Sequence, residues 1–395
     1  MSRILNSVFC FLSSLDRACR DRSHVSPLLR SKSYILHSAM LAILFCLSSC
    51  SAAQQTLKPI TFRGTSDASA AVALTDDLIL VADDENNILR VYRTTGPDLP
   101  VFSYDLTEFL ETDSDHPEAD IEGATRIGDR IYWITSHGRN KDGGLRPSRY
   151  RFFATDIKIV DNTISLQPVG KPHKMLVQSL LNNPAMRRLG LREATRLDDD
   201  LSKKQREQLA PKDKGLNIEA LAASPDGNTL FIGFRNPLPL DKTTGRACAL
   251  VIPLTNPQQV VEKGASPAFA EPILWDMNDL GLRSMEYSGF HKAFFIIAGR
   301  ADETPDFALY RWSGKTDEKP ALLKRMSQSD LTPEALIPFE KSEKLLLLSD
   351  DGSLLIKVAG PHECLKGEYR KDGSCENKAL LDPNRKTFRA LRLTP

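Results

Sequence analysis

The sequence predicts an all-β fold, a β-propeller with five visible blades and an interval long enough to hold a sixth. A short apolar strand that begins beside a polar residue, a turn and a second apolar strand recur along the chain. Turn-forming pairs such as Asp-Gly and Gly-Asp separate many of these strands. One such unit cannot bury its own faces, so its repetition indicates a solenoid or a propeller.

The first strand of each unit is expected to line a central axis, with a second and a third strand following outward. The first strands carry, in order, Ser69, Glu122, Glu219, Glu286 and Glu334. Second strands are expected at residues 78–81, 131–134, 230–233, 293–297 and 345–348. Third strands are expected at residues 88–92, 149–153, 247–253, 307–312 and 354–358.

Two segments fall outside this repeat. Residues 174–210 carry apolar side chains at helical spacing and predict a helical insertion on one face. The long interval from Glu122 to Glu219, which contains this insertion, leaves room for a degenerate sixth blade. Residues 387–393 predict a last outer strand near the start of the fold, which would close the ring and protect its edges.

The composition is that of an ordinary globular protein: 395 residues, 41% of them hydrophobic and 26% charged, with a net charge of +1. The first 50 residues carry a net charge of +4, which leaves the remainder near −3, so the remainder gives no electrostatic support for binding nucleic acid. The sequence contains no serine-hydrolase elbow, zinc-protease helix motif, Walker loop or dinucleotide fingerprint.

The start of the chain reads as a targeting segment. Basic residues precede the apolar run 39–47, which is too short to span a membrane and is followed by small residues. This pattern divides the chain into a signal peptide and leader (1–50), a linker (51–58) and a single propeller domain (59–395).

The segment Leu47-Ser48-Ser49-Cys50 resembles the lipobox of bacterial lipoproteins, in which the cysteine is lipidated. In that class of signals, Ser51 after the cysteine favours the outer membrane. The alternative is a plain secretory signal with an incidental Cys50. Either interpretation predicts an exported protein of the bacterial cell envelope, in the periplasm or at the outer membrane. In the lipoprotein interpretation, the protein contacts the membrane only through its lipid anchor.

Cysteine usage agrees with export. Cys364 and Cys375 bracket a Gly- and Lys-rich segment, and in an oxidising compartment this pair predicts a disulfide that closes a surface loop. Metal ligation by the pair is the weaker alternative, because no second Cys/His pair stands at a matching spacing.

Several segments resemble one bacterial family, the domain of unknown function numbered 3616, which is a predicted β-propeller family. The resemblance runs from about Pro59 to the C-terminus; it implies the propeller fold and names no activity. Asp120-x-Glu122-Gly123 is also distantly similar to the phytase-esterase-like propellers. The segments that carry the family resemblance are residues 62–70, 81–92, 120–123, 136–140 and 217–221.

Converging first strands would place up to four carboxylates around one opening, and like charges held together need partners. Two arrangements satisfy them. If arginines pair with the glutamates, the ring is a structural ion-pair network. If the carboxylates face the channel, they offer oxygen ligands for Ca²⁺ or Mg²⁺, and the arginines can bind an anionic substrate. The glutamates are Glu122, Glu219, Glu286 and Glu334, and the arginines are Arg139, Arg235 and Arg300.

Other candidates lie near the same opening. His137 follows a predicted strand end, so it and Glu122 are the candidates for general acid–base catalysis; a structural histidine is the alternative. The acidic run 83–87 has the composition of a Ca²⁺ loop without the spacing of an EF-hand, and a strand-connecting turn explains it more simply.

These observations lead to two functional hypotheses. The first is an exported, lipid-anchored propeller with an acidic, arginine-lined axial pocket that hydrolyses a phosphoester or an ester of a small anionic molecule with help from Ca²⁺ or Mg²⁺. The second is a non-catalytic propeller, without a cofactor, that binds an envelope protein or a glycan.

Overall fold

The computed structural model describes residues 58–211, 214–302, 304–326 and 330–395. The leader, most of the predicted linker and Cys50 lie outside the described residues. The residues from Leu57 to Pro395 form one compact unit. None of the helices described is both long and apolar enough to cross a membrane.

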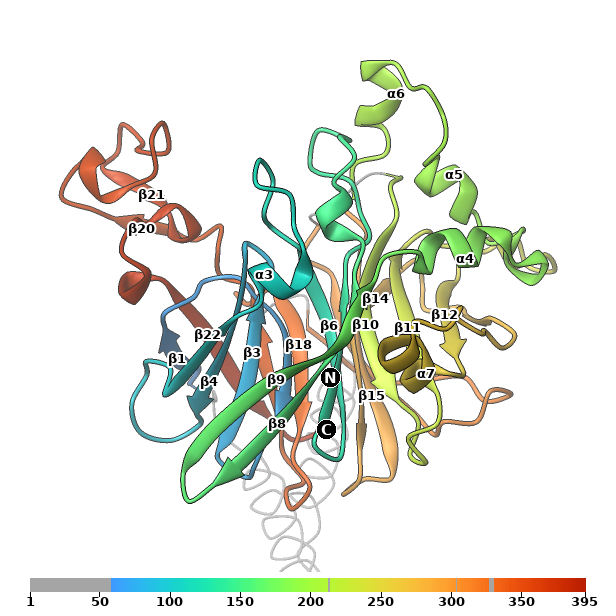
Figure 1. The fold of residues 1–395 in the computed structure, drawn as a ribbon, viewed down its shortest axis with the longest axis horizontal. Coiled ribbons are helices and arrows are strands. Elements are labelled where there is room, and N and C mark those ends of the chain that lie inside the picture. The colour runs from blue at the N-terminus through green and yellow to red at the C-terminus, as the bar shows by residue number, and fades with distance from the viewer. Residues whose placement is uncertain (1–57, 212–213, 303, 327–329) are drawn as a thin grey trace, which may run out of the picture. The chain divides into compact units, whose positions relative to one another are not determined.

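The unit contains five four-stranded antiparallel sheets, which are the blades (Figure 1). The first two blades are β2 (Ala68–Ala73), β3 (Leu78–Asp83), β4 (Asn86–Arg93) and β5 (Phe102–Asp105), then β6 (Ile121–Ile127), β7 (Arg130–Thr135), β8 (Phe152–Val160) and β9 (Thr163–His173). The next two are β10 (Asn217–Ala223), β11 (Leu230–Asn236), β12 (Ala249–Leu254) and β13 (Ile273–Trp275), then β14 (Gly281–Ser288), β15 (Ala293–Gly299), β16 (Phe307–Trp312) and β17 (Ala321–Arg325).

The fifth blade joins the two ends of the described chain. Its strands β18 (Pro333–Pro338) and β19 (Leu345–Ser349) are followed by β22 (Thr387–Leu393), and β1 (Ile60–Arg63) pairs with β22 as the outermost strand. The predicted closing strand at 387–393 therefore exists, but it is the third strand of its blade rather than the outer one. Residues 354–358 do not supply that third strand, because β20 (Leu355–Lys357) pairs instead with β21 (Ser374–Glu376).

The inner strands β2, β6, β10, β14 and β18 contact one another in this order, and β18 contacts β2. The described ring thus closes with five blades. The described residues between Glu122 and Glu219 form no sixth blade; they include the long β8–β9 hairpin and the predicted helical insertion. The insertion contains α4 (Leu176–Asn182), α5 (Leu191–Thr195) and α6 (Lys203–Glu207).

Apolar side chains fill the spaces between neighbouring blades. One cluster joins the second and third blades and takes in Leu176, Val177 and Leu180 of the insertion. Another joins the third and fourth blades around Trp275 and Trp312. The remaining helices are α3 (Thr107–Leu110), α7 (Pro257–Lys263) and short 3-10 turns at Pro147–Arg149, Pro184–Met186, Pro361–Glu363, Asn377–Ala379 and Pro383–Arg385.

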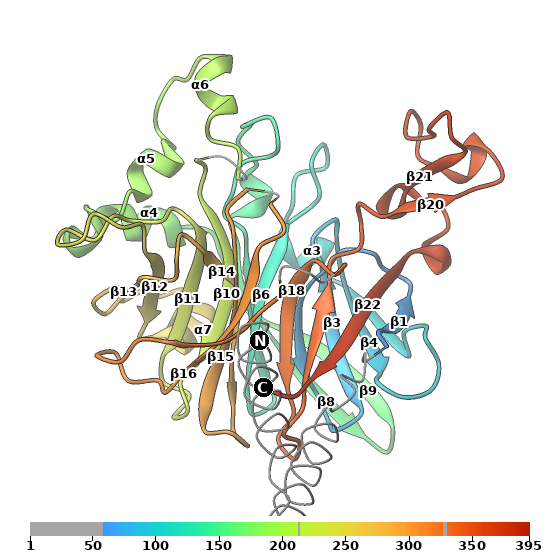
Figure 2. The same ribbon diagram turned by 180° about the vertical axis from the view of Figure 1, so that it is seen from behind.

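The longest connections lie at one end of the axis, which we call the mouth. Each inner strand begins at this end, and each second strand ends there. The mouth is therefore formed by two kinds of connection: the segment that enters each blade and the segment that joins its second and third strands. They include the insertion and an excursion of residues 350–386, which the disulfide Cys364–Cys375 closes as predicted. Figures 1 and 2 both draw α4–α6 and the β20–β21 hairpin beyond the same end of the inner strands.

Each inner strand carries a shift of register, a β-bulge, near the mouth. A bulge leaves one residue unpaired with the neighbouring strand and re-aims its side chain. The bulged residues are Ser69, Glu122, Glu219, Arg283 and Glu334. In the fourth blade the equivalent position is therefore Arg283, and the predicted ring member Glu286 lies three residues further along the axis.

A candidate metal centre at the mouth of the propeller

Three of the bulged residues, Glu219, Arg283 and Glu334, form an ion-pair network with Arg235 at the axis. Glu219 Oε1 accepts hydrogen bonds from Arg235 Nη1 (2.8 Å) and Asn217 Nδ2 (2.7 Å), and its Oε2 accepts one from Arg283 Nη1 (2.8 Å). Arg283 also lies 3.1 Å from Glu334 Oε1. Burial alone would raise the pKa of Glu219, but the two guanidinium groups outweigh it and lower this pKa. Arg235 and Glu219 thus pair as the structural alternative expects.

Two of the bulged glutamates, Glu334 and Glu122, are short of partners. Glu334 is only 8% exposed, and its Oε2 has no hydrogen-bond partner in the described structure. Burial raises the pKa of Glu334 to about 8, despite Arg283. No described residue donates a hydrogen bond to Glu122, and burial together with Asp120 and Glu219 raises its pKa well above the usual range.

Further carboxylates lie next to Glu122 and form two overlapping groups. Oxygens of Asp67, Asp84 and Glu85 lie within 4.8 Å of one another, and so do oxygens of Asp84, Asp120 and Glu122. Asp84 belongs to both groups, and its Oδ1 is buried without a hydrogen-bond partner. Carboxylate oxygens at this spacing are the donor set that Ca²⁺ and Mg²⁺ prefer.

Local backbone geometry positions these carboxylates. Asp84 and Glu85 lie in the turn between β3 and β4, where Asp83 Oδ1 accepts a hydrogen bond from the Glu85 amide (2.8 Å). The Asp84 amide donates to the carbonyl of Asp67 across the mouth end of the first blade (3.3 Å). Asp120 enters β6 with φ of 60°, a left-handed conformation that is uncommon for residues other than glycine. This conformation sets the direction of its carboxylate.

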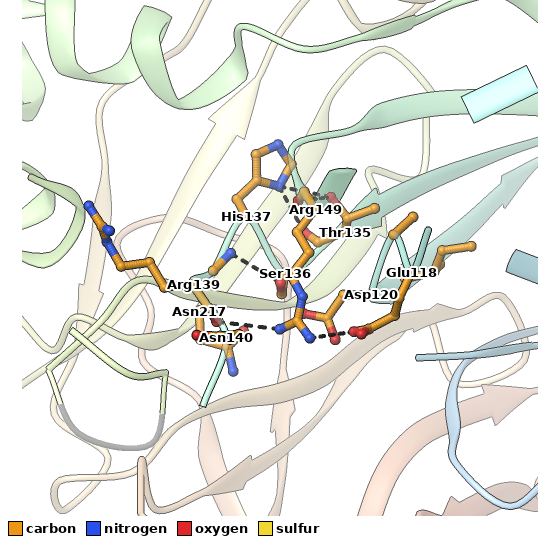
Figure 3. Close-up of polar contacts among 12 residues, drawn as sticks. Glu118, Asp120, Thr135, Ser136, His137, Arg139, Asn140, Arg149 and Asn217 are labelled. Atoms are coloured by element: carbon orange, nitrogen blue, oxygen red, sulfur yellow. Dashed lines mark hydrogen bonds and ion pairs between the residues drawn. The ribbon is translucent and has the colours of Figure 1, made fainter. Parts of the chain in front are cut away.

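Two cationic side chains contact these groups. Lys378 Nζ lies 2.7 Å from Glu85 Oε1. Arg149 Nη1 lies 2.9 Å from Asp120 Oδ2, and its Nη2 pairs with Glu118. Figure 3 shows the Arg149 guanidinium beside both acids. The acids at the mouth therefore outnumber the basic groups that contact them.

The excess of acids contributes to raising the pKa values of these carboxyl groups. Burial, with Asp350 and Asp83, raises the pKa of Asp67 to about 9, and burial, with Asp67 and Glu122, raises that of Asp84 well above its usual range. With a pKa of about 9, Asp67 holds a proton at neutral pH unless another positive charge enters. A divalent cation would supply that charge, and the carboxylate oxygens of the two groups are suitable ligands for it.

Two predicted residues, His137 and Arg139, lie away from this centre. His137 is fully buried, its Nδ1–H donates to the carbonyl of Thr135 (2.8 Å), and burial lowers its pKa to about 4. Arg139 donates to the backbone carbonyls of Thr195 (3.0 Å) and Arg196 (3.1 Å), so it anchors the insertion. Figure 3 shows both side chains pointing away from the Arg149–Asp120 pair.

Arg300 and Glu286 are also separate from the two groups. Arg300 is partly exposed and lies 3.6 Å from Asp302. Glu286 lines the same narrow axial cavity as Glu122, which has room for about one water molecule. Its nearest described partner is Thr125 Oγ1 at 3.4 Å, and burial raises its pKa well above the usual range.

The centre also uses residues that the sequence analysis did not assign. Asp67 and Asp120 precede the bulges of their strands by two residues, a spacing that an alignment of the five repeats by their bulges would have revealed. Asp84 and Glu85 belong to the acidic run that composition marked as a turn. Lys378 has no sequence signal, because the fold of the excursion alone brings it to the mouth.

Gly352 provides a test of the packing at the centre. A Cβ at this position would lie 1.6 Å from Asp67 Oδ1, and Asp67 is buried, so its carboxylate has little room to move. We expect Gly352→Ala to lower the free energy of unfolding by about 1–3 kcal/mol, the usual cost of overpacking. Chemical denaturation would measure it, with Gly289→Ala as the control because a Cβ there meets nothing within 4 Å. Equal stability of the two variants would contradict the packing described.

The fold and the site define a five-bladed β-propeller with an acidic, partly arginine-neutralised mouth. The chain belongs to the family described as "Protein of unknown function (DUF3616)", whose model matches residues 67–356. A comparison with curated proteins found no match.

Solved structures with propeller folds resemble the chain at low identity. The glutaminyl cyclase of Myxococcus xanthus is 9% identical, with 74% of this chain and 90% of that chain covered and a TM-score of 0.38. The PQQ-bound aldose sugar dehydrogenase of Streptomyces coelicolor is 8% identical, with 85% and 99% covered and a TM-score of 0.39. At these TM-scores the likenesses carry no argument about function.

Proposed function

We propose that this protein binds a divalent cation of the Ca²⁺ or Mg²⁺ class at the mouth of the propeller and uses it to hydrolyse a phosphoester or an ester of a small anionic molecule. One observation carries the proposal: two overlapping carboxylate groups share Asp84, whose Oδ1 is buried and has no hydrogen-bond partner. The unpartnered Oε2 of Glu334 beside the same network supports it.

The residues divide into ligands and supports. Asp67, Asp84, Glu85, Asp120 and Glu122 would hold the cation, which when bound would polarise the scissile group of the ester. Glu122 accepts no hydrogen bond from a described residue, so its carboxylate is available to take a proton from the attacking water. Water adds to the phosphorus or the carbonyl carbon, the ester oxygen leaves as an alcohol, and that oxygen takes up a proton.

The ring arginines have a different role in this proposal. Arg235 and Arg283 keep Glu219 ionised and fix the positions of three neighbouring blades, so Glu219 is not included in the ligand set. His137 is also left out, because its ring has no access to solvent. We further propose that the protein is exported and anchored to the outer membrane through Cys50; detection of lipidated Cys50 by mass spectrometry of membrane fractions would test this.

Calorimetric titration tests cation binding. We expect Ca²⁺ or Mg²⁺ to bind the full chain, and Asp84→Asn to weaken binding by at least about 100-fold because the variant removes a charged ligand from both groups. Asp317→Asn, a change at an exposed acid remote from the mouth, is the matched control and should bind as the unmodified protein does.

The same preparations separate the two functional classes. Chelator-sensitive release of phosphate or acid from phosphoester and ester substrates, lost in Asp84→Asn, would support the hydrolase. Cation binding without hydrolysis of any substrate would favour the non-catalytic binding propeller. If neither cation binds, the carboxylate groups are structural and the proposal fails.

A further inference from the structure

Lys378 is the cationic group at the mouth that no blade supplies. It belongs to the excursion of residues 350–386, between β19 and β22. Its Nζ lies 2.7 Å from Glu85 Oε1, and both side chains are about two-fifths exposed. Glu85 is at the same time a member of the acidic group that contains Asp67 and Asp84.

The backbone at Lys378 is fixed on both sides. The preceding residue, Asn377, is fully buried, and its Nδ2 donates to the carbonyls of Asp351 (3.0 Å) and Thr387 (2.6 Å). The following residues, Ala379 and Leu380, pack against the disulfide in a small apolar core. The amide of Lys378 itself donates to the carbonyl of Gly352 (3.0 Å). The excursion therefore presents this lysine at a defined place on the rim.

The side chain, by contrast, has unused hydrogen-bonding capacity. An ammonium group has three donors on a flexible stem. Of the described residues, only Glu85 accepts from Lys378 Nζ. A cation that takes Glu85 as a ligand would compete with this ion pair and release the ammonium, which would then stand beside the bound cation.

We propose that Lys378 is the anion-binding residue of the centre: it neutralises Glu85 in the cation-free protein, and in the cation-bound protein it donates to a phosphoryl group. This inference rests on the proposed function and narrows its substrate class to phosphoesters. A phosphoryl group has three strong acceptor oxygens, so it can contact a cation and an ammonium group together. Arg149 remains paired with Glu118 and Asp120.

Independent support for an occupant comes from Glu334. This residue is 8% exposed, its Oε1 lies 3.1 Å from Arg283, and its Oε2 lacks a partner in the described structure. Its charge also contributes to raising the pKa of Glu122. A buried polar atom without a partner is uncommon in folded proteins and calls for a bound group. The centre therefore does not rest on the acidic cluster alone.

Two titrations of the full chain test the role of Lys378. The probe is methylphosphonate, a phosphoryl anion that cannot be hydrolysed to phosphate, added with and without saturating Ca²⁺. We expect binding only with Ca²⁺, and a loss of at least about tenfold in affinity in Lys378→Ala, because a charge-assisted hydrogen bond is removed. Ca²⁺ itself should bind Lys378→Ala several-fold more tightly, because a competing positive charge has gone.

Opposite changes in the two affinities distinguish this role from a structural one, since damage to the excursion would weaken both. Lys378→Arg should keep methylphosphonate binding, and Lys371→Ala, an exposed lysine of the same excursion, should behave as the unmodified protein. Unchanged methylphosphonate affinity in Lys378→Ala, or equal binding without Ca²⁺, would overturn the inference while leaving the cation site in place. Absence of Ca²⁺ binding in the unmodified protein would overturn the proposed function and this inference with it.

Discussion

Replacing Arg283 by methionine is expected to lower the free energy of unfolding by about 3–5 kcal/mol. Arg283 is 5% exposed and contacts Glu219 Oε2 at 2.8 Å and Glu334 Oε1 at 3.1 Å. Methionine keeps much of the side-chain length but removes the charge, so two buried carboxylates lose their shared partner. Breaking a buried ion pair on one side carries a cost of this size because the remaining charge is uncompensated.

Chemical denaturation at pH 7 measures this effect, and two further variants test whether it comes from the ion pairs. The double variant Arg283→Met with Glu219→Gln should recover part of the lost stability, because it removes a charge that the first change left without its shared partner. Arg300→Met is the matched control, since Arg300 is partly exposed and its contact with Asp302 is long, and it should stay within about 0.5 kcal/mol. If Arg283→Met costs no more than this control, the ring of bulged residues is not an ion-pair network.

The role of Arg283 also explains where prediction from sequence succeeded and where it did not. Repeated strand pairs predicted the propeller because a period of apolar strands and turns is a local signal. The position that faces the axis is set by a bulge, and a bulge adds one residue without a signature in the apolar pattern. The other four blades have Ser or Glu at this position. The apolar pattern therefore selects Glu286 in the fourth blade, three residues beyond the bulged Arg283.

The fifth blade shows a second limit. Residues 354–358 have the apolar pattern of a third strand and follow β19 directly, but they pair with β21 inside the excursion. The true third strand, β22, lies beyond the excursion, because pairing between distant segments is decided by packing of the whole ring. For the same reason the sequence predicted the Cys364–Cys375 disulfide from its local spacing and gave no indication that the neighbouring Lys378 reaches Glu85.

The second large effect concerns pH and cation together. Asp67 and Glu334 have pKa values raised to about 9 and about 8, first by burial and then by neighbouring acids, whereas both titrate near 4 in an unfolded chain. Between these limits the folded state binds more protons than the unfolded state. Without a cation, the contribution of these two groups to the free energy of unfolding is therefore fully present below pH 4. It is lost as the pH rises through the folded pKa values of about 8 and about 9.

A bound cation should reverse this dependence above neutral pH. Carboxylates must be ionised to bind a cation. Below the folded pKa of the ligand carboxylates, the affinity for the cation therefore rises about tenfold per pH unit for each proton that the cation displaces. At a free concentration 100 times the dissociation constant, binding adds about 2.7 kcal/mol to stability. We therefore expect a fixed concentration of Ca²⁺ to raise the midpoint of thermal unfolding clearly at pH 8.5 and hardly at all at pH 5.5.

Thermal scans at the two pH values, with and without Ca²⁺, make this measurement, and Asp84→Asn serves as the control that should respond at neither. An equal shift at both pH values would mean that the cation binds acids that are already ionised at pH 5.5, away from the buried groups at the mouth. A shift confined to high pH and absent in Asp84→Asn would tie the raised pKa values and the cation to the same carboxylates. The protons on these acids and the cation would then be alternative ways of neutralising one excess of negative charge.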